Sequence, residues 1–353
     1  MPLILGLLFA FTAVAEPNQF SLTAGGDVMF GRYSEAGYRE VGGANPFAMI
    51  SGELSRSDLS FVNLESPLMD GHPARRPTAP RGLVFRGEAY RAQQLVDAGV
   101  DVVTLANNHT EDLRMAGVQS SLEILEQVGL ASFGAAAEGD PFAPAVLEHE
   151  GIPVLFFGAT TRRNLGEPGK DQWIPSAYRH WRWLKDEMPA RVRKAREEFP
   201  NALIFVSMHW GEEYVTSAPR EHQRLAHTVI DAGANGVLGH HPHVLQPVEV
   251  YRGAPILYSM GNLVFDQRGL SKRRSALFTM EWTRSATDGW QLAGLELIPL
   301  MLPGGHDGPS LASPEQARPI LDGAIQGARA QGTALTERNG RLYWRPASQP
   351  DSD

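Results

Sequence analysis

Residues 236–266 read GVLGHHPHVLQPVEVYRGAPILYSMGNLVFD, and this stretch decides how the rest of the chain is interpreted. Three histidines, His240, His241 and His243, follow a short apolar run. Pro242 disfavours the α region for His241, so the pattern predicts the cluster at the exit of a strand rather than inside a helix. Because alternate residues of an extended segment share a face, we expect His241 and His243 to point at one position.

Outward from this cluster, apolar strand-like runs alternate with helical patterns, which is typical of a layered α/β fold. Strands are predicted at 20–24, 59–64, 100–106, 153–158, 202–208, 256–265, 276–284 and 290–300, the last three of them antiparallel. Helices are predicted at 46–58, 88–98, 113–128, 177–199, 220–232 and 314–331.

The composition narrows the possible functions. A chain of 353 residues can bury a large core, and no long linker divides it, so one main domain is favoured. The 32 Lys and Arg against 40 Asp and Glu give a net charge of −8, and the basic residues form no long run, so no nucleic-acid partner is expected. Because the chain has no cysteine, a metal would be held by His, Asp, Glu or Asn.

The first residues, MPLILGLLFAFTAVAEP, form an apolar run that ends in a small-x-small pattern at Ala13-Val14-Ala15. We expect residues 1–15 to be a signal peptide and the protein to be exported to the periplasm or the extracellular space. The run is too short to span a bilayer comfortably, and no Lys or Arg precedes it. A mis-chosen start codon or an uncleaved N-terminal membrane anchor is the alternative, and no other segment is expected to cross a membrane.

Polar side chains stand at or just past the ends of five predicted strands, beside glycine, proline or asparagine. They are Asp27, Glu65, Asn108 with His109, His209, and His241 with His243. Ligand sites in open α/β sheets gather at the carboxyl ends of the strands. We therefore expect one rim that collects oxygen and imidazole donors, a mixed set that suits Mn, Fe or Zn better than Ca or Mg.

Each of these residues also has an ordinary structural role. Asp27 suits a turn or a helix cap, and Asn108 suits a turn because asparagine tolerates left-handed geometry. Glu65 could be a solvated loop carboxylate, and His109 and His209 could be hydrogen-bonded strand-end imidazoles. The joint occurrence of the five strand ends is what favours a metal site.

Six blocks carry a resemblance to a known family: GGDVMFGR, VNLESPL, LANNHTED, MHWGEEY, GHHPHVLQPVEVY and ILYSMGNLVFD. In this order they resemble the CapA-type poly-γ-glutamate capsule-biosynthesis proteins, a branch of the calcineurin-like metallophosphoesterase superfamily. The resemblance extends from about residue 21 to about residue 283. It implies a four-layer α/β/β/α sandwich of the metallo-dependent phosphatase type over residues 16–303, with 304–353 as a C-terminal helix and tail that packs on or trails from this domain.

The resemblance also implies the roles of the site residues. One or two divalent ions would be held by Asp27, Glu65, Asn108, His209, His241 and His243, and His109 would be the general acid that protonates the leaving group. His240 lies outside the family's His-x-His register and is expected next to the ligands rather than among them. Contacts around the metal or to the substrate are expected from Glu212, Glu213 and Asn262, which could equally be ordinary strand-end polar residues.

Two features depart from the superfamily pattern. Asp27-Val28-Met29 lacks the second imidazole of the usual Asp-x-His block, and Glu65 replaces the usual bridging aspartate. Both changes are normal for the CapA branch, but they leave strict two-metal phosphoesterase chemistry open.

Two functions remain open from the sequence. The first is an exported metal-dependent hydrolase or transferase that acts on an anionic polymer, an amide or a phosphoester. The second is a non-catalytic polymer-handling or capsule-assembly component that keeps a metal-binding rim. Because His109 is present beside Asn108, as an acid would be, the first is favoured. Capsule synthase components are expected partners of either.

Arginines hint at an anionic substrate, either a polymer or a small molecule. They flank the loop after Glu65 or follow a strand end, at Arg75, Arg76, Arg81, Arg86, Arg162 and Arg163. Guanidinium forks suit carboxylate or phosphate groups. Solvated loop arginines are the simpler interpretation.

Overall fold

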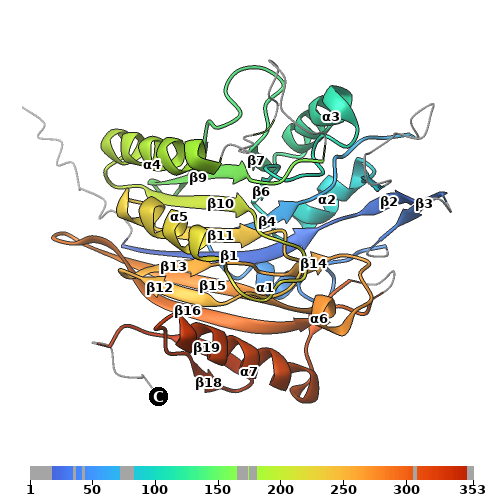
Figure 1. The fold of residues 1–353 in the computed structure, drawn as a ribbon. Coiled ribbons are helices and arrows are strands. Elements are labelled where there is room, and N and C mark those ends of the chain that lie inside the picture. The colour runs from blue at the N-terminus through green and yellow to red at the C-terminus, as the bar shows by residue number, and fades with distance from the viewer. Residues whose placement is uncertain are drawn as a thin grey trace, which may run out of the picture.

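The structure is a computed structural model, and it describes residues 18–34, 37–41, 44–71, 83–164, 174, 181–304 and 308–347. In this part of the chain two β-sheets stack face to face, and helices cover their outer faces (Figure 1). The larger sheet is built from β1 (Gln19–Val28), β4 (Leu59–Leu64), β6 (Val102–Thr104), β7 (Ala131–Phe133), β14 (Asn262–Val264), β15 (Arg274–Ser285), β16 (Gly289–Met301), β17 (Ser310–Leu311), β18 (Thr336–Arg338) and β19 (Arg341–Trp344).

The smaller sheet is built from β8 (Ala145–His149), β9 (Ile152–Thr160), β10 (Leu203–His209), β11 (Gly236–His240), β12 (Val248–Tyr251) and β13 (Ala254–Leu257). A short third sheet contains β2 (Gly31–Ser34), β3 (Gly37–Glu40) and β5 (Val84–Phe85). The helices are α1 (Ser51–Leu54), α2 (Tyr90–Asp97), α3 (Arg114–Gln127), α4 (Trp181–Glu198), α5 (Arg220–Asp231), α6 (Leu270–Arg273) and α7 (Pro314–Ala330).

Aromatic side chains fill the interface between the two main sheets. Phe61 of β4 stacks on Phe156 of β9 with ring centroids 6.0 Å apart, and Phe205 of β10 packs edge-on against Trp282 of β15 at 5.0 Å. All four rings are buried in one apolar cluster that draws on both sheets. Burial of this interface drives the stacking of the two sheets.

Each sheet carries a second apolar cluster on its outer face. Helices α4 and α5 bury Leu184 and Leu225 against the smaller sheet. Helices α2 and α3 bury Leu95 and Leu125 against the larger one. The layers therefore run α/β/β/α, and the predicted four-layer sandwich is confirmed.

Parallel pairing brings the carboxyl ends of strands from both sheets to one edge. In the larger sheet, Asp27 of β1 is in register with Asn63 of β4 and with Asn262 of β14. In the smaller sheet, His209 of β10 is in register with His240 of β11. The strand ends of the two sheets are in contact, because His240 Nδ1 lies 3.1 Å from Asp27 Oδ1.

The prediction of one continuous antiparallel strand over 256–265 is wrong, although its first part, β13, does pair antiparallel with β12. The segment forms β13, which runs parallel to β11, and β14, which runs parallel to β1 in the other sheet. The chain changes sheets at Gly261, whose φ of +71° favours glycine. The crossing is tight, because a Cβ added at Gly26 would lie 2.0 Å from the carbonyl oxygen of Gly261.

The predicted helix over 46–58 is also wrong in extent, since only α1 is helical there. Phe47, Ile50 and Leu54 are buried at a spacing that suits a helix. Turns bury these side chains without a longer helix, and one of the turns is closed by the 2.9 Å hydrogen bond from Ile50 N–H to the Phe47 carbonyl. The remaining predicted helices correspond to α2, α3, α4, α5 and α7, and residues 177–180 of the predicted helix over 177–199 lie outside the described residues.

The C-terminal segment packs on the larger sheet. Helix α7 begins with a capping box between Ser313 and Gln316 and buries Ile320 and Leu321 in the inter-sheet core. Strand β19 pairs with β16, across the predicted domain boundary at residue 303. The predicted signal peptide lies outside the described residues, among which no helix is long and apolar enough to cross a membrane.

Candidate metal centre

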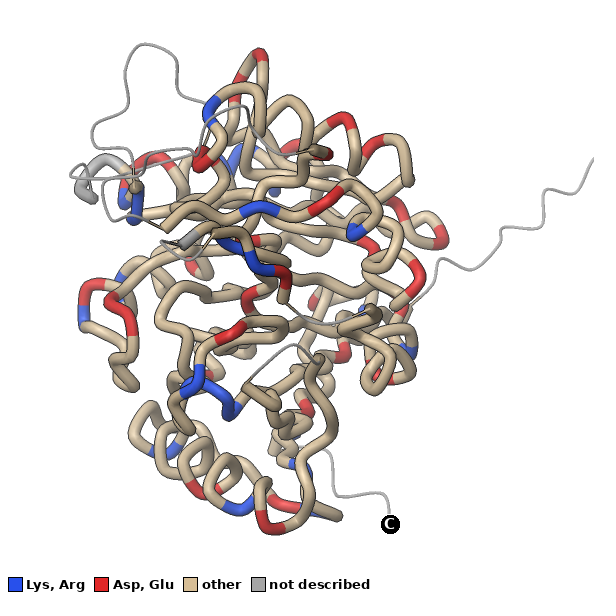
Figure 2. Tube along the Cα trace, turned by 90° about the vertical axis from the view of Figure 1, so that its right-hand side faces the viewer, with Lys and Arg blue, Asp and Glu red and all other residues tan. Residues whose placement is uncertain are grey.

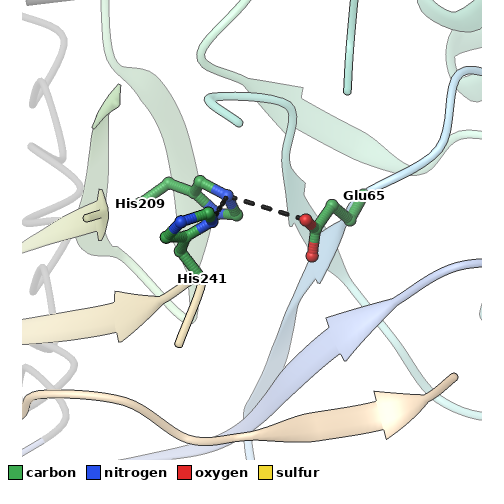
Figure 3. Close-up of side chains that lie close together, drawn as sticks. All are labelled: Glu65, His209 and His241. Carbon is green, nitrogen blue, oxygen red and sulfur yellow. Dashed lines mark hydrogen bonds and ion pairs between the residues drawn. The ribbon is translucent and has the colours of Figure 1, made fainter. Parts of the chain in front are cut away.

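The first candidate ligand group lies where β4, β10 and β11 end. It contains Glu65, His209 and His241, whose ligand atoms all lie within 4.8 Å of one another. His209 Nε2 is 3.6 Å from Glu65 Oε1 and 3.1 Å from His241 Nδ1 (Figure 3). Asn108 Oδ1 lies 2.8 Å from the same His209 nitrogen. Four predicted ligands thus face a common point.

A second group contains Asp27, Glu65 and His243, again with ligand atoms within 4.8 Å of one another. His243 Nδ1 is 3.2 Å from Asp27 Oδ2, and its Nε2 is 3.8 Å from Glu65 Oε1. Glu65 belongs to both groups. A carboxylate shared between two ligand groups would suit a pair of metal ions.

The Glu65 carboxylate provides the test of whether the residues fit a metal. Its side chain is fully buried, and neither oxygen has a hydrogen-bond partner among the described residues. Burial raises the pKa of Glu65 well above its usual range, and the nearby carboxylates of Asp27 and Glu213 raise it further. A buried carboxylate without a partner is costly, and a bound cation would remove that cost.

The two histidines of the first group also fit a metal. Burial lowers the pKa of His209 well below its usual range, and the neighbouring His241 imidazole lowers it further. Burial likewise lowers the pKa of His241, with His243 adding to the effect. Both rings are therefore neutral near neutral pH, which is the form that donates a lone pair to a metal.

Asp27 is held ionised by two neighbouring imidazoles. Burial alone would raise the pKa of Asp27, but its hydrogen bonds with His240 and His243 outweigh burial and hold the pKa well below its usual range. His240 contacts Asp27 and belongs to neither ligand group. His240 thus lies against Asp27, and its place beside a bound metal stays a prediction.

The expectation of an extended His-Pro-His segment is wrong. His241 has φ +96° and His243 has φ +57°, so both residues are left-handed. Proline at 242 disfavours the right-handed α region for His241, and the chain turns sharply instead of running on as a strand. Such backbone costs roughly 1–3 kcal/mol per residue and is found mainly at functional sites.

The tautomer of His243 is fixed by Asn262. The Asn262 amide nitrogen donates to the carbonyls of His243 and Lys272 and to Gln267 Oε1, which turns its oxygen towards His243. His243 Nδ1 then donates to Asn262 Oδ1 at 2.9 Å. The lone pair of His243 is therefore on Nε2, which faces Glu65.

His109 lies beside the ligand groups without belonging to either. Its Nδ1–H donates to Asp112 Oδ2 at 2.7 Å, since a carboxylate can only accept. Its ring stacks on Phe85 with centroids 3.6 Å apart, and the side chain of Asn107 accepts a hydrogen bond from its backbone N–H. The imidazole is thus held in one orientation.

The other predicted site residues fall in different places. The Glu212 side chain is 72% exposed and pairs with Arg162, so its proposed substrate contact stays a prediction. Glu213 is exposed but close enough to raise the pKa of Glu65. Of the arginines, Arg86 is buried against the carbonyls of Met69 and Gly71 and against Glu88, and Arg163 pairs with the buried Glu111. Arg75, Arg76 and Arg81 lie outside the described residues.

Four polar residues of the site were not predicted from the sequence. Asn63 donates to Asp27, Asn107 donates to Asn63, Asp112 binds His109, and Asn164 accepts from Asn108. Asn63, Asn107 and Asp112 stand within three positions of a predicted site residue, and this proximity was the available signal. Asn164 follows a different strand, directly after Arg162 and Arg163, which the sequence indicates only as possible substrate contacts.

Comparison with known proteins shows which family the sequence of this chain matches. The sequence profile described as "Bacterial capsule synthesis protein PGA_cap" matches residues 21–267. The capsule biosynthesis protein CapA of Bacillus anthracis is 29% identical over 90% of this chain and 79% of its own length. The PGA biosynthesis protein CapA of Bacillus subtilis is 26% identical over 84% of this chain and 79% of its own length.

Among solved structures, a protein described as a novel phosphatase from Mycoplasma pneumoniae aligns with 14% identity. The alignment covers 80% of this chain and 87% of that one, with a TM-score of 0.41.

Proposed function

Since the chain belongs to the PGA_cap family of bacterial capsule synthesis proteins, we propose that it is a metal-dependent hydrolase or transferase that acts on an anionic polymer, an amide or a phosphoester during capsule synthesis. The observation that carries the proposal is the buried Glu65 carboxylate, which belongs to two ligand groups and has no hydrogen-bond partner among the described residues.

The ligand set supports one or two divalent ions of the Mn, Fe or Zn type. Asp27, Glu65 and His243 would hold one ion, and Glu65, Asn108, His209 and His241 would hold the other. Imidazole and carboxylate ligands together favour these metals over Ca or Mg. When bound, such ions act as Lewis acids towards a phosphoryl or carbonyl oxygen.

His109 is the residue that we propose as the general acid. Because Asp112 accepts from Nδ1–H, the proton that reaches the leaving group would be carried on Nε2. Asp112 stabilises the charged imidazole, and Phe85 fixes the plane of the ring. A histidine whose only task was structural would not need to stand beside the ligand groups in this way.

A second function is favoured by the burial of the ligands. The candidate ligand with the largest exposed fraction, Asn108, is only 6% exposed, and Asp27 and Glu65 are fully buried. So closed a site is also suited to a metal that stabilises a non-catalytic polymer-handling or capsule-assembly component. Capsule synthase components would be partners of the protein in either role, and export remains part of both proposals.

The two functions are separated by an activity measurement. The purified chain would be loaded with Mn, Fe or Zn and incubated with a generic phosphodiester and, separately, with γ-linked polyglutamate. We expect metal-dependent turnover that is lost in Asp27→Asn and kept in Asp322→Asn, a change of the same charge on the exposed face of α7. Tight metal binding without turnover of either substrate would favour the assembly role.

A further inference from the structure

A pair of arginines shares one carboxylate beside the metal centre. Arg32 of β2 donates from Nη2 to Asp266 Oδ1, and Arg39 of β3 pairs with Asp266 Oδ2. The Asp266 side chain is 4% exposed and that of Arg32 is 16% exposed. Two guanidinium groups on a single carboxylate leave one positive charge uncompensated within the cluster.

The Arg32 guanidinium lies over two rings that contact the site. Its Cζ is 5.1 Å from the centre of Phe85, which stacks on His109. It is 5.9 Å from the centre of Phe265, whose ring lies 4.6 Å from that of His243. Cation–π contacts of this kind hold a guanidinium in a fixed orientation.

Arg32 keeps hydrogen-bond donors that the described protein does not use. A guanidinium has five N–H groups, and Asp266 is the one acceptor that Arg32 contacts among the described residues. Its Nε–H is buried without an acceptor in that part of the chain. An unpaired buried donor is unfavourable, so an oxyanion from outside the protein would be bound with a gain.

Acidic groups of the site act on Arg32. Burial lowers the pKa of Arg32, while Tyr214, Glu65 and Glu213 act in the opposite direction. Arginine nevertheless stays charged at all relevant pH values. The guanidinium is therefore a permanent positive charge within electrostatic reach of the ligand that both metal groups share.

A second cation is linked to His243 through the ring of Tyr214. Lys272 Nζ lies 3.6 Å from the centre of the Tyr214 ring, and that ring lies 6.4 Å from the His243 ring. Basic and acidic positions are otherwise intermixed on this side of the molecule (Figure 2). A bound anion would therefore be held by particular side chains rather than by a broad basic surface.

We propose that Arg32, positioned by Asp266, binds an oxyanion of the substrate, a carboxylate or a phosphate, next to the metal centre, with Lys272 as the second cation of this subsite. The inference rests on the proposed function in taking the metal centre as the reacting site. It assigns to Arg32 a role in substrate binding that is separate from metal binding.

The test is calorimetric titration of the folded chain at low ionic strength, with and without Mn²⁺. The probes are a γ-linked glutamate tetramer, which carries carboxylates, and inorganic phosphate. We expect Arg32→Gln to weaken binding of at least one probe about 10- to 100-fold, as for other charged hydrogen bonds. The probe that responds identifies the oxyanion. Arg252→Gln, at the exposed turn after β12, makes the same charge change and is expected to bind within about twofold of wild type.

Arg32→Lys keeps the positive charge but removes the planar guanidinium with its paired N–H donors. It is the variant to titrate if Arg32→Gln does not fold. We expect it to weaken binding by about fivefold or more. Wild-type binding in both Arg32 variants, or equal weakening in Arg252→Gln, would overturn the subsite. Failure of the chain to take up Mn²⁺ would overturn the proposed function alone, because the Arg32 effect is then still measurable in the metal-free titration.

Discussion

Glu65 is the residue on which the candidate centre depends most. Asp27 accepts hydrogen bonds from two imidazoles, whereas Glu65 has no hydrogen-bond partner among the described residues. Its pKa is raised by burial and by neighbouring carboxylates, so protonation of Glu65 competes with metal binding.

The pKa shifts of the buried histidines predict how stability depends on pH in the metal-free protein. The pKa values of His209 and His241 are lowered from 6.5 by burial, so the unfolded chain takes up protons below that pH that the folded chain does not. The contribution of these two rings to stability therefore falls as the pH drops through 6.5. Glu65, whose pKa is raised from 4.5, acts in the opposite direction by losing stability as the pH rises.

The histidine contribution is isolated by the double variant His209→Gln/His241→Gln. Urea unfolding of metal-free wild type should show lower stability at about pH 5.5 than at about pH 7, and the double variant should show a smaller decrease. An equal decrease in both proteins would show that these two rings do not stay neutral in the folded state.

A second prediction concerns His109. Replacing it with asparagine should lower kcat about 10²- to 10⁴-fold, the usual contribution of a general acid, with the metal content unchanged. His149→Asn, in a partly exposed histidine of β8, serves as the control. A His109→Asn variant with wild-type turnover, or one that loses its metal, would remove the general-acid role.

Most of the candidate site residues could be predicted, because a polar side chain that follows a predicted strand can be identified in the sequence. The conformation of His241 could not, since proline excludes one backbone region without selecting among the others. Asn164 could not be predicted either, because its relation to Asn108 exists only after the loops have been placed.

At the scale of elements, the passage from β13 to β14 organises the centre. Gly261 carries the chain between the sheets and accepts a 2.9 Å hydrogen bond from Asp27 N–H. The sequence could not show this passage, because the apolar run 256–265 looks the same whether its two halves lie in one sheet or in two. The strand lengths of β10, β15 and β16 were closer to prediction because buried apolar residues mark most of their length.

The close approach of Gly26 to Gly261 predicts that Gly26→Ala destabilises the protein. The new Cβ would lie 2.0 Å from the carbonyl oxygen of Gly261, so the backbone would have to move. We expect a loss of about 1–3 kcal/mol in the free energy of unfolding, as for other overpacked sites, and weaker metal binding because Asp27 is displaced.

The matched control is Gly323→Ala in α7, where an added Cβ meets no atom within 4 Å. It should leave stability unchanged or raise it by up to about 1 kcal/mol. Urea unfolding of the two variants compares them directly. If Gly26→Ala were as stable as Gly323→Ala, the close approach at the crossing would not exist.

At the scale of the whole molecule, α7 and β19 pack on the same sheet that carries Asp27. Leu321 of α7 is buried in the inter-sheet core, whereas Leu311 of β17 is 45% exposed. Leu321→Ala should therefore cost about 2–5 kcal/mol of stability, and Leu311→Ala much less. Both should unfold in one transition. A separate early transition in Leu321→Ala would show that the C-terminal segment is an independent unit.

The layer order was predictable because the family that the six blocks resemble implies it, while the alternation of strands and helices alone favours only a layered α/β class. The pairing of β19 with β16 was not predictable, since β18 is short and exposed and β19 is short with a single fully buried residue, so neither carries a clear apolar pattern.

The most direct test of the central claim is the number of metal ions bound per chain, measured by elemental analysis after loading with Mn²⁺ and removal of excess metal. Because Glu65 belongs to both ligand groups, we predict that wild type and Asp322→Asn bind two ions and that Glu65→Ala binds neither. A wild-type chain that retains no metal, or a Glu65→Ala chain that retains both ions, would contradict the account.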